Sequence, residues 1–456
     1  MQDATALAEA VRRREAAPVE LVEETFRRIE ATEPQLNAFV TLCHEEALAA
    51  AGGELPDGPF RGVPIAIKDL TDVGGVRTTY SSRPLADNVA RADAALVRRL
   101  KAAGFVVVGK TNTPEFGSTA VTESLLNGAC RNPWDPERTP GGSSGGAAAH
   151  VAAGVLPLAH GTDGGGSIRI PASCCGLFGI KPSRGRISTA PYGDGSFSLG
   201  QSGPLSWTVR DAAAFLDVAA GYEPGDAAWL PPPNRSFSGE VGVPPGRLRV
   251  AWTIDPALPY SVDEPCARAT RDAAALLEEL GHDVVEQTPP WQDDSVLDRF
   301  SFLWRMGPAL FPVDPSALEP LNELLARRAH ETTAVEYGQQ VIALQRYARL
   351  VAGFWEDVDI VLTPTLAKLP VPIGWVFESE DPWEQFTRAA EFTPFTPALN
   401  LTGQPAASVP FGEADGLPVG VQLIARAGAE ATLIRLAAQF EEARPWIDRR
   451  PPLRVA

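Results

Sequence analysis

Apolar residues follow two patterns along the chain. Near the start they recur at helical spacing, as at Leu7 and Val11, and Pro18 stands where a second helix would begin. Elsewhere they form short β-branched runs, and GVPIAIKDL (62–70) predicts a buried strand that ends at Lys68. Helices that alternate with such runs indicate an α/β protein with a largely buried sheet.

This alternation continues through most of the chain. No low-complexity linker or internal repeat interrupts it, which favours one domain over the whole of 1–456. Residues 291–395 carry many large aromatic side chains among helical stretches and prolines, and we expect them to supply a wide apolar substrate pocket. Further predicted elements are helices over 93–103, over 263–280 and from Ala429 onward, and the strands FVVVGK (105–110), RLRVAW (247–252), HDVVEQ (282–287), DIVLTPT (359–365), PAASVPFG (405–412) and PVGVQLIA (418–425).

Composition excludes several classes of function. The net charge of −17 disfavours long contacts with nucleic acid or anionic lipid, and no apolar run reaches the length of a membrane span. The 5 cysteines have no regular spacing, which indicates free thiols in a reducing compartment, and the chain starts without an apolar signal segment. We therefore expect a cytoplasmic protein. No cysteine and histidine cluster has zinc spacing, so we expect neither a metal nor a cofactor.

The segment GFVVVGKT (104–111) matches the phosphate-loop pattern of nucleotide-binding proteins. That mechanism requires a loop between the glycines, whereas Phe-Val-Val-Val belongs in a strand. Gly104 is better explained as the residue that ends the preceding helix. Nucleotide binding at Gly104–Thr111 is therefore a weak alternative.

The segment GSSGG (142–146) matches the nucleophile elbow of α/β-hydrolases, with Ser144 at its centre. An elbow must follow a strand, but the preceding NPWDPERTPG contains three prolines. His282 and His330 remain candidate bases, although each is more simply explained as a surface residue. We weigh this hypothesis below the next one.

A third constellation combines Lys68 with Ser143 and Ser167 and needs no histidine. Burial at the end of an apolar strand would disfavour the charged form of Lys68, so that this lysine could act as a base. A serine hydroxyl could then pass it the proton of the nucleophile. Each feature alone is more simply a solvated lysine or an ordinary glycine turn, but the three together favour catalysis.

The stretch 141–188 carries the pattern of a known family. GGSSGG (141–146), TDGGGSIRIPA (162–172) and GIKPSRGR (179–186) together resemble the amidase signature family of serine hydrolases, and segments outside this core resemble it over nearly the whole chain. The resemblance implies a single large α/β/α domain around a mixed, mostly parallel β-sheet. It also implies hydrolysis of amide bonds through an acyl-enzyme.

Carried over position by position, the resemblance assigns Ser167 as the nucleophile and Lys68 as the base. Ser143 is the bridging serine, preceded by a cis peptide bond from Gly142. Tetrahedral intermediates need preorganised donors for their oxyanion, and successive N–H groups of Gly164, Gly165, Gly166 and Ser167 can form such a nest. The family often has a larger residue at the position of Gly164, so this loop is expected to be looser.

Other residues are expected to support this set without touching the substrate. We interpret Asp163 and Arg169 as an ion pair that braces the loop, and we place Gly142 and Ser144 in the same supporting group. Asp69 should point away from Lys68, because a neighbouring carboxylate would oppose loss of the lysine's proton.

The substrate is expected to be a small molecule. The N-terminal MQDATALAEAVRRRE, CRNPWDP (130–136) and RPWIDRRPP (444–452) look most similar to the nylon-oligomer (aminohexanoate cyclic-dimer) hydrolase branch. This favours aryl or xenobiotic amides, including linear or cyclic oligoamides. Carbamates or esters are alternatives on the same three residues, and an amidotransferase A subunit is an alternative that the acidic charge disfavours. The sequence is compatible with a homodimer and does not determine the oligomeric state.

Overall fold

The computed structural model of the chain describes residues 2–193, 198–293 and 295–455. The first part of the chain forms a three-stranded sheet in the order β1-β3-β2, in which β3 pairs antiparallel with β1 and parallel with β2. Its elements are α1 (Ala4–Arg12), α2 (Pro18–Leu36), β1 (Phe39–Leu42), α3 (His44–Gly52), β2 (Pro64–Lys68), α4 (Ala95–Ala102) and β3 (Val106–Thr111).

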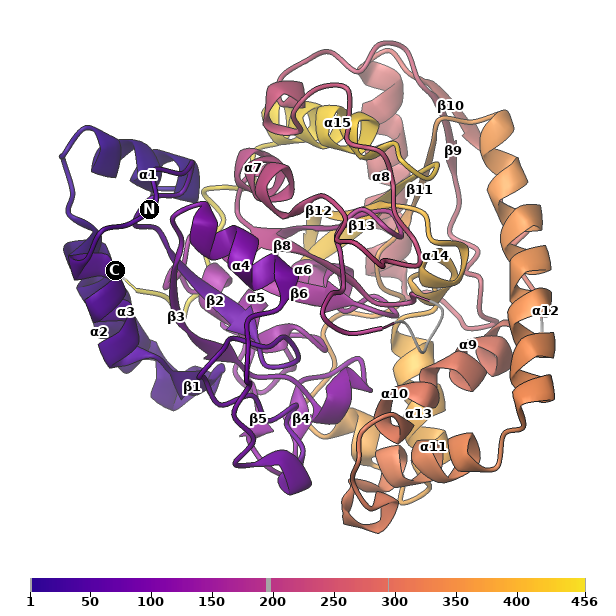
Figure 1. Cartoon of the computed structure of the whole chain (residues 1–456). Helices are drawn as coiled ribbons and strands as arrows, with labels where there is room; N and C mark the ends of the chain where they lie inside the picture. Colours follow the sequence, from indigo (N-terminus) through magenta and orange to yellow (C-terminus); the bar gives the residue numbers. More distant parts are fainter. Residues whose placement is uncertain (1, 194–197, 294, 456) are drawn as a thin grey trace.

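Strand β2 joins this small sheet to the large one. All five of its residues are buried, as its apolar sequence predicts. At its end the backbone N–H of Lys68 donates to Nδ1 of His160 in β6 (Leu158–Asp163), at 3.4 Å. Lys68 therefore lies where β2 meets β6, the edge strand of the large sheet, and Figure 1 shows these two strands next to each other.

The large sheet has eight strands in the order β10-β9-β11-β13-β12-β7-β8-β6. The predicted α/β class and the mixed sheet are confirmed. The parallel pairs in this sheet are β10–β9 and β9–β11, whereas the other neighbours run antiparallel. The remaining strands of the sheet are β7 (Phe178–Lys181), β8 (Gln201–Ser206), β9 (Arg249–Trp252), β10 (Asp283–Glu286), β11 (Ile360–Pro364), β12 (Ala406–Ala414) and β13 (Leu417–Ala425).

Antiparallel pairs outnumber parallel pairs in this sheet, which differs from the expected mostly parallel arrangement. One of the antiparallel pairs has a short connection in place of a helical crossover. Strands β12 and β13 form a hairpin whose turn residues Asp415 and Gly416 have φ of 53° and 75°. Such left-handed values at two successive positions suit a tight hairpin turn. The turn lies where the sequence EADG predicts it.

Helices cover both faces of the large sheet. A Cβ on Gly420 of β13 would meet Ser173 of α6 (Arg169–Cys175), and one on Gly412 of β12 would meet Ala269 of α8 (Glu264–Glu279). Gly412 pairs with Val419, and residues 419 and 420 face opposite sides of their strand, so α6 and α8 lie on opposite faces. The other helices along the sheet are α5 (Gly145–Ala152), α7 (Val209–Ala219) and α15 (Glu430–Ala443).

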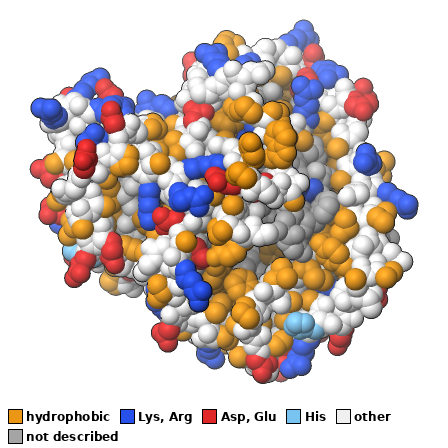
Figure 2. All heavy atoms as spheres, in the orientation of Figure 1, with side chains coloured by type: hydrophobic (Ala, Val, Ile, Leu, Met, Phe, Trp, Pro, Cys, Tyr) orange, Lys and Arg blue, Asp and Glu red, His pale blue; other side chains and the backbone are white. Residues whose placement is uncertain are grey.

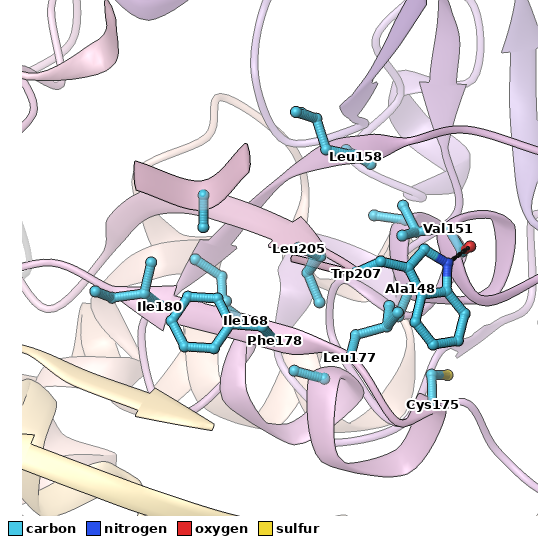
Figure 3. Packing of buried hydrophobic residues seen from close by; sticks show 14 of the residues in the cluster. Ala148, Val151, Leu158, Ile168, Cys175, Leu177, Phe178, Ile180, Leu205 and Trp207 are labelled. Atoms are coloured by element: carbon cyan, nitrogen blue, oxygen red, sulfur yellow. Dashed lines mark hydrogen bonds between the residues drawn. The ribbon is translucent and has the colours of Figure 1, made fainter. Parts of the chain in front are cut away.

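Residues of α5, α6 and strands β6 to β8 form one buried core (Figure 3). Trp207 belongs to this core and donates its indole N–H to the carbonyl of Val151 at 2.8 Å. Cys174 and Cys175 are free and buried, and burial raises the pKa of both thiols. These contacts support the packing role predicted for the two cysteines.

The segment with many aromatic residues forms a helical flank beside the sheet (Figure 1). Several of its rings, among them Trp291 and Trp355, belong to a second buried core, and two rings of that core, Phe300 and Phe386, also face the site described below. Its helices are α9 (Val296–Trp304), α10 (Met306–Ala309), α11 (Pro320–His330), α12 (Ala334–Gly353), α13 (Pro382–Phe392) and α14 (Pro397–Thr402). The short elements of the chain are β4 (Glu123–Ser124), β5 (Gly128–Ala129) and the 3₁₀ turns η1 (Arg83–Leu85), η2 (Glu115–Gly117), η3 (Ser238–Glu240), η4 (Pro315–Ala317), η5 (Phe354–Glu356) and η6 (Trp375–Phe377).

Charged and apolar side chains are mixed over the face shown in Figure 2. None of the helices in the described ranges combines the length and the apolar character needed to cross a membrane. Over the same ranges, no group of three or more His, Cys, Asp and Glu side chains could hold a metal ion.

Candidate active site

Lys68 and Ser143 meet directly in the centre of the molecule. Nζ of Lys68 donates to Oγ of Ser143 at 2.7 Å, and both residues are buried. Ser143 lies just before α5, and the peptide bond between Gly142 and Ser143 is cis. A Cβ on Gly142 would lie 2.6 Å from backbone atoms of Val121, so no side chain fits at that position.

Ser167 lies in the loop between β6 and α6, next to this pair. The backbone N–H of Ser144 donates to the carbonyl of Ser167 at 3.3 Å, which ties the two serine loops together. Ser167 is 5% exposed and lines a cavity, so its side chain is accessible from one side. The fold thus brings together Lys68, Ser143 and Ser167 from three separate segments.

Ser144 supports the site instead of facing the cavity. Its hydroxyl donates to the carbonyl of Thr162 at 3.2 Å and accepts from the N–H of the same residue at 3.3 Å. The elbow hypothesis also lacks its base, because His282 is engaged elsewhere, with Leu248 N and Gln439, and His330 is exposed at the end of α11. The residues before Ser144 form no strand. The elbow hypothesis therefore finds no support in the geometry.

The phosphate-loop hypothesis is wrong for a similar reason. Three of its four variable residues, Val106 to Val108, lie in β3, and Gly104 follows α4 with φ of 94°. Lys110 is fully buried, and its Nζ donates to Asp69 Oδ1 at 3.1 Å and to Thr78 Oγ1 at 2.6 Å. A lysine held in this way cannot reach a nucleotide phosphate.

Burial lowers the pKa of Lys68 well below its usual range, while the charge of Asp163 opposes the shift. Asp69 does not oppose this lowering of the Lys68 pKa. Its carboxylate binds Lys110 and Thr79 and so points away from Lys68, as expected. Burial, followed by the charges of Lys68 and Lys110, also lowers the pKa of His160 to about 3. The site therefore favours an uncharged amine next to Ser143.

This depressed pKa predicts a gain in stability when the amine is removed. A lysine with a lowered folded-state pKa binds its proton less tightly than in the unfolded chain, so it opposes folding at pH values below about 10.4. Lys68→Met should therefore be inactive, yet its free energy of unfolding at pH 7 should be at least as large as that of the parent. Its advantage should shrink as the pH rises towards the ordinary lysine pKa.

Denaturant unfolding at pH 7 and pH 9.5 measures this effect. Lys101→Met is the matched control, because Lys101 is partly exposed and paired with Asp93, so its loss should not stabilise the fold. A Lys68→Met variant clearly less stable than the parent at pH 7 would contradict the depressed pKa.

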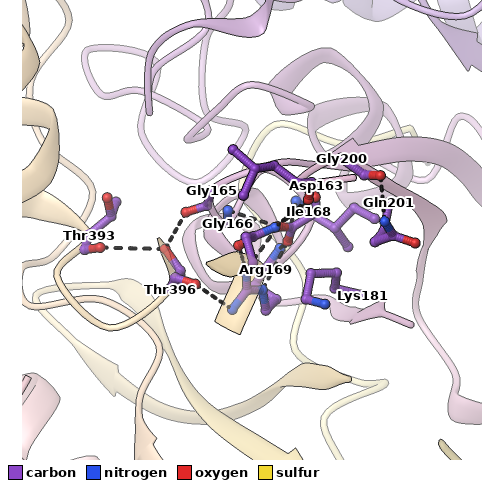
Figure 4. A network of polar contacts seen from close by, with 12 residues as sticks. Asp163, Gly165, Gly166, Ile168, Arg169, Lys181, Gly200, Gln201, Thr393 and Thr396 are labelled. Carbon is purple, nitrogen blue, oxygen red and sulfur yellow. Dashed lines mark hydrogen bonds and ion pairs between the residues drawn. The ribbon is translucent and has the colours of Figure 1, made fainter. Parts of the chain in front are cut away.

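The glycine loop before Ser167 borders the polar network around Asp163 and Arg169, where Figure 4 labels Gly165 and Gly166. Among the described residues, no hydrogen bond engages the backbone N–H of Gly164, Gly165 or Ser167. Gly166 departs from the expectation, because its N–H donates to Oδ1 of Asp163 at 2.8 Å. The donors left for an oxyanion are therefore those of Gly164, Gly165 and Ser167.

Each glycine of the loop accommodates a different neighbour. A Cβ on Gly164 would lie 2.7 Å from the ring of Trp304, and one on Gly165 would lie 2.8 Å from the ring of Phe300. Gly166 has φ of 129°, and its Cβ would lie 2.3 Å from Oγ1 of Thr396. The ring of Trp304 thus occupies the space that a larger residue at 164 would fill, and the expected loose loop is instead packed.

Asp163 and Arg169 form a fully buried ion pair beneath this loop, with Nη2 of Arg169 2.8 Å from Oδ1 of Asp163. Although burial opposes ionisation, Arg169 holds the pKa of Asp163 far below its usual range. Asp163 also accepts the N–H groups of Gly166 and Ile168 at 2.8 and 3.2 Å. The pair therefore fixes the loop that carries Ser167.

Comparison with known proteins identifies the family. A family model described as Amidase matches residues 20–434. The chain belongs to the amidase signature family. It is 40% identical to the 6-aminohexanoate-cyclic-dimer hydrolase of Paenarthrobacter ureafaciens, over 99% of this chain and 97% of that protein. It is 36% identical to an acylamidase of Rhodococcus erythropolis, over 98% of this chain and 96% of that protein.

Solved structures agree with this assignment. A substrate complex of 6-aminohexanoate cyclic dimer hydrolase superposes with a TM-score of 0.94 at 38% identity, covering 99% of both chains. A bacterial aryl acylamidase of the amidase signature family gives 0.87 at 28% identity, covering 98% of this chain and 96% of that one. The protein is thus an amidase, a hydrolase of amide C–N bonds.

The cavity of this amidase beside Ser167 is apolar but narrow. Its volume is about 50 Å³, and the side chains around Ser167 include Ile170, Leu297, Phe300, Trp304 and Phe386. Phe300, Trp304 and Phe386 come from the aromatic segment, as expected. The cavity is not wide, because Phe300 and Trp304 stack on one another, 5.0 Å between ring centroids, directly against the glycine loop.

Several polar residues of the amidase site were not found from sequence. Arg169 also donates to Gln422 Oε1 at 2.7 Å, Asn400 Oδ1 at 2.7 Å and the carbonyl of Thr396 at 3.1 Å. The hydroxyl of Thr396 donates to the carbonyl of Gly165 at 2.6 Å. These residues lie more than 200 positions from Arg169, so no spacing pattern connects them.

Lys181 is a second buried lysine near this network, within the stretch GIKPSRGR. Burial, and then the charge of Arg169, lowers its pKa to about 7. Its Nζ donates to the carbonyl of Pro182 at 3.0 Å. Its place in a family motif is the only signal by which the sequence could have indicated it.

Proposed function

We propose that this amidase cleaves carboxylic amides through an acyl-enzyme on Ser167, with Ser143 as proton relay and Lys68 as base. The contact that carries the proposal is the 2.7 Å hydrogen bond from Lys68 Nζ to Ser143 Oγ. An uncharged lysine can accept a proton, and the depressed pKa of Lys68 favours that state.

In the first half-reaction, Ser167 Oγ attacks the amide carbon as its proton passes to Ser143 Oγ and that of Ser143 passes to Lys68 Nζ. The N–H groups of Gly164, Gly165 and Ser167 receive the oxyanion, and losing one such donor costs about 2.7–4 kcal/mol. The intermediate collapses, the proton returns along the same path to the leaving nitrogen, and the amine departs. Water then attacks the ester of Ser167 by the same route and releases the acid.

We further propose aryl or other apolar xenobiotic amides as substrates, including linear or cyclic oligoamides. Support comes from the aromatic walls of the cavity and from relatives named as a 6-aminohexanoate-cyclic-dimer hydrolase and an aryl acylamidase. Aryl carbamates and esters carry the same carbonyl and would use the same three residues.

A substrate panel tests this proposal. Acetanilide should be cleaved with a higher kcat/KM than acetamide, because both form the same acyl-enzyme and only the anilide offers a ring to the apolar cavity. The kcat/KM values of aryl carbamates and aryl esters in the same panel compare carbamate and ester hydrolysis with amide hydrolysis. A higher kcat/KM for acetamide would refute the apolar-substrate proposal.

A pair of variants locates the preference. Phe386→Ala removes a ring from the cavity beside Ser167 and should reduce the anilide-to-acetamide ratio. Phe377→Ala removes a ring that lines a different cavity and should leave that ratio unchanged. Equal effects of the two substitutions would argue against recognition at Phe386.

A further inference from the structure

A second cavity lies on the other side of the segment that walls the active site. Its volume is about 400 Å³, and Thr119 lines both this cavity and the one beside Ser167. This volume falls within the range of about 300–1,000 Å³ that is typical of small-molecule sites. No element of the proposed mechanism uses it.

Three glutamates line this second cavity: Glu115 and Glu123 from one segment, and Glu319 from a segment far away in the sequence. Glu115 accepts hydrogen bonds from Ser82 Oγ at 2.6 Å and from Asn322 Nδ2 at 2.8 Å. Glu319 accepts the N–H of Leu125 at 2.6 Å, and its own N–H donates to Glu115 at 2.9 Å. These contacts hold the carboxylates in fixed positions around one space.

Glu123 is the member of this group with a buried oxygen that is free to accept a hydrogen bond. It is 9% exposed, and its Oε2 accepts the N–H of Gly374 at 3.0 Å. Its Oε1 is buried and has no hydrogen-bond partner. A buried polar atom without a partner costs about 1–3 kcal/mol, so a ligand that supplies a donor would recover that energy.

The charge of the three acids is not balanced within the cavity, because its lining contains no lysine or arginine. Burial raises the pKa of Glu123 and of Glu319 to about 7, and it raises that of Glu115 as well. The nearest cations oppose these shifts from outside the lining: Arg131 acts on Glu123, and Arg83 acts on Glu115 and Glu319. An added cation inside the cavity would stabilise the ionised acids.

We propose that this cavity is a binding site for a primary alkylammonium ion. An ammonium group offers three N–H donors to carboxylate oxygens, which accept only. The hydrocarbon chain would lie against the apolar part of the lining, which includes Leu125, Leu321 and Phe377. A metal ion is disfavoured, since no side-chain group in the described residues is arranged to hold one.

Calorimetric titration with n-hexylammonium chloride at pH 8 tests the site. The parent should bind one equivalent, and hexan-1-ol, which has the chain without the charge, should bind at least tenfold more weakly. Glu123→Gln should weaken hexylammonium binding by about tenfold to a hundredfold, the usual effect of losing a hydrogen bond to a charged group. Glu279→Gln, at an exposed glutamate of α8, is the matched control and should bind like the parent.

Two further variants separate this site from the proposed active site and from misfolding. Ser167→Ala should bind hexylammonium like the parent, whatever the fate of the acyl-enzyme proposal. Glu123→Gln should be at least as stable to heat as the parent at pH 8, because it removes a buried charge with a raised pKa. If it fails to fold, Glu319→Gln gives the same test on the second acid.

The result that overturns the proposal is specific. Hexylammonium binding that is absent from the parent, or unchanged in both Glu123→Gln and Glu319→Gln, excludes an alkylammonium site in this cavity. Binding that is lost in Ser167→Ala and retained in Glu123→Gln would place the amine in the active site instead.

Discussion

Ser167→Ala and Lys68→Arg should each reduce kcat for amide hydrolysis by at least about 10⁴-fold. Alanine removes the nucleophile, whereas arginine keeps its proton at all relevant pH values and cannot serve as base. Because the two residues act as one unit, the double variant should cost little more than either single one. Steady-state kinetics on a chromogenic anilide measure these losses, and circular dichroism checks that each variant is folded.

The same account fixes the pH profile of the parent enzyme. Only the uncharged amine of Lys68 is active, so log kcat/KM should rise with unit slope as the pH increases and level off well below the pH at which an ordinary lysine loses its proton. The rise should occur at a pH well below the pKa of an ordinary lysine, because burial lowers the pKa of Lys68. An active Lys68→Arg enzyme, or a flat profile from about pH 5 to 9 with rate-limiting chemistry, would remove Lys68 from the role of base.

Arg169→Met should destabilise the fold by about 3–5 kcal/mol, because it leaves the buried carboxylate of Asp163 without its countercharge. Asp163 is held ionised mainly by Arg169 against the opposing effect of burial, so its pKa should rise in the variant. Loss of the brace should also displace the glycine loop and lower kcat. Urea unfolding at pH 7.5 measures the first effect, and anilide hydrolysis measures the second.

Arg247→Met provides the matched control for this prediction. Arg247 and Asp283 also form an ion pair, but their side chains are 72% and 52% exposed. Exposed pairs contribute about 0–1 kcal/mol, so the control should unfold almost like the parent. Equal losses in the two variants would show that the buried pair does not brace the site.

Local pattern was enough to predict much of the fold. The run PIAIK is buried on both faces and forms β2, and the two runs around EADG form the β12–β13 hairpin. The pairing between distant strands was harder to predict, because a buried apolar run has the same sequence pattern whether its neighbouring strand is parallel or antiparallel. The mostly parallel sheet was therefore an incorrect expectation for a sheet with parallel pairs on one side only.

Within the site, short motifs were enough to predict which residues the fold brings together. The glycine and serine loops led to Ser143 and Ser167, which the fold places near Lys68. Prediction from the sequence failed for features that depend on contacts between distant segments. The N–H of Gly166 is taken by Asp163, and Trp304 and Phe300 narrow the cavity by packing on the glycine loop.

Fluorophosphonate labelling followed by peptide mass spectrometry tests the central claim most directly. A fluorophosphonate reacts with an activated serine and leaves a phosphonyl adduct on its oxygen. The account predicts one adduct per chain, on Ser167, with loss of activity in proportion to labelling and no adduct in Lys68→Arg. Labelling on Ser144, or full inactivation with Ser167 unmodified, would contradict it.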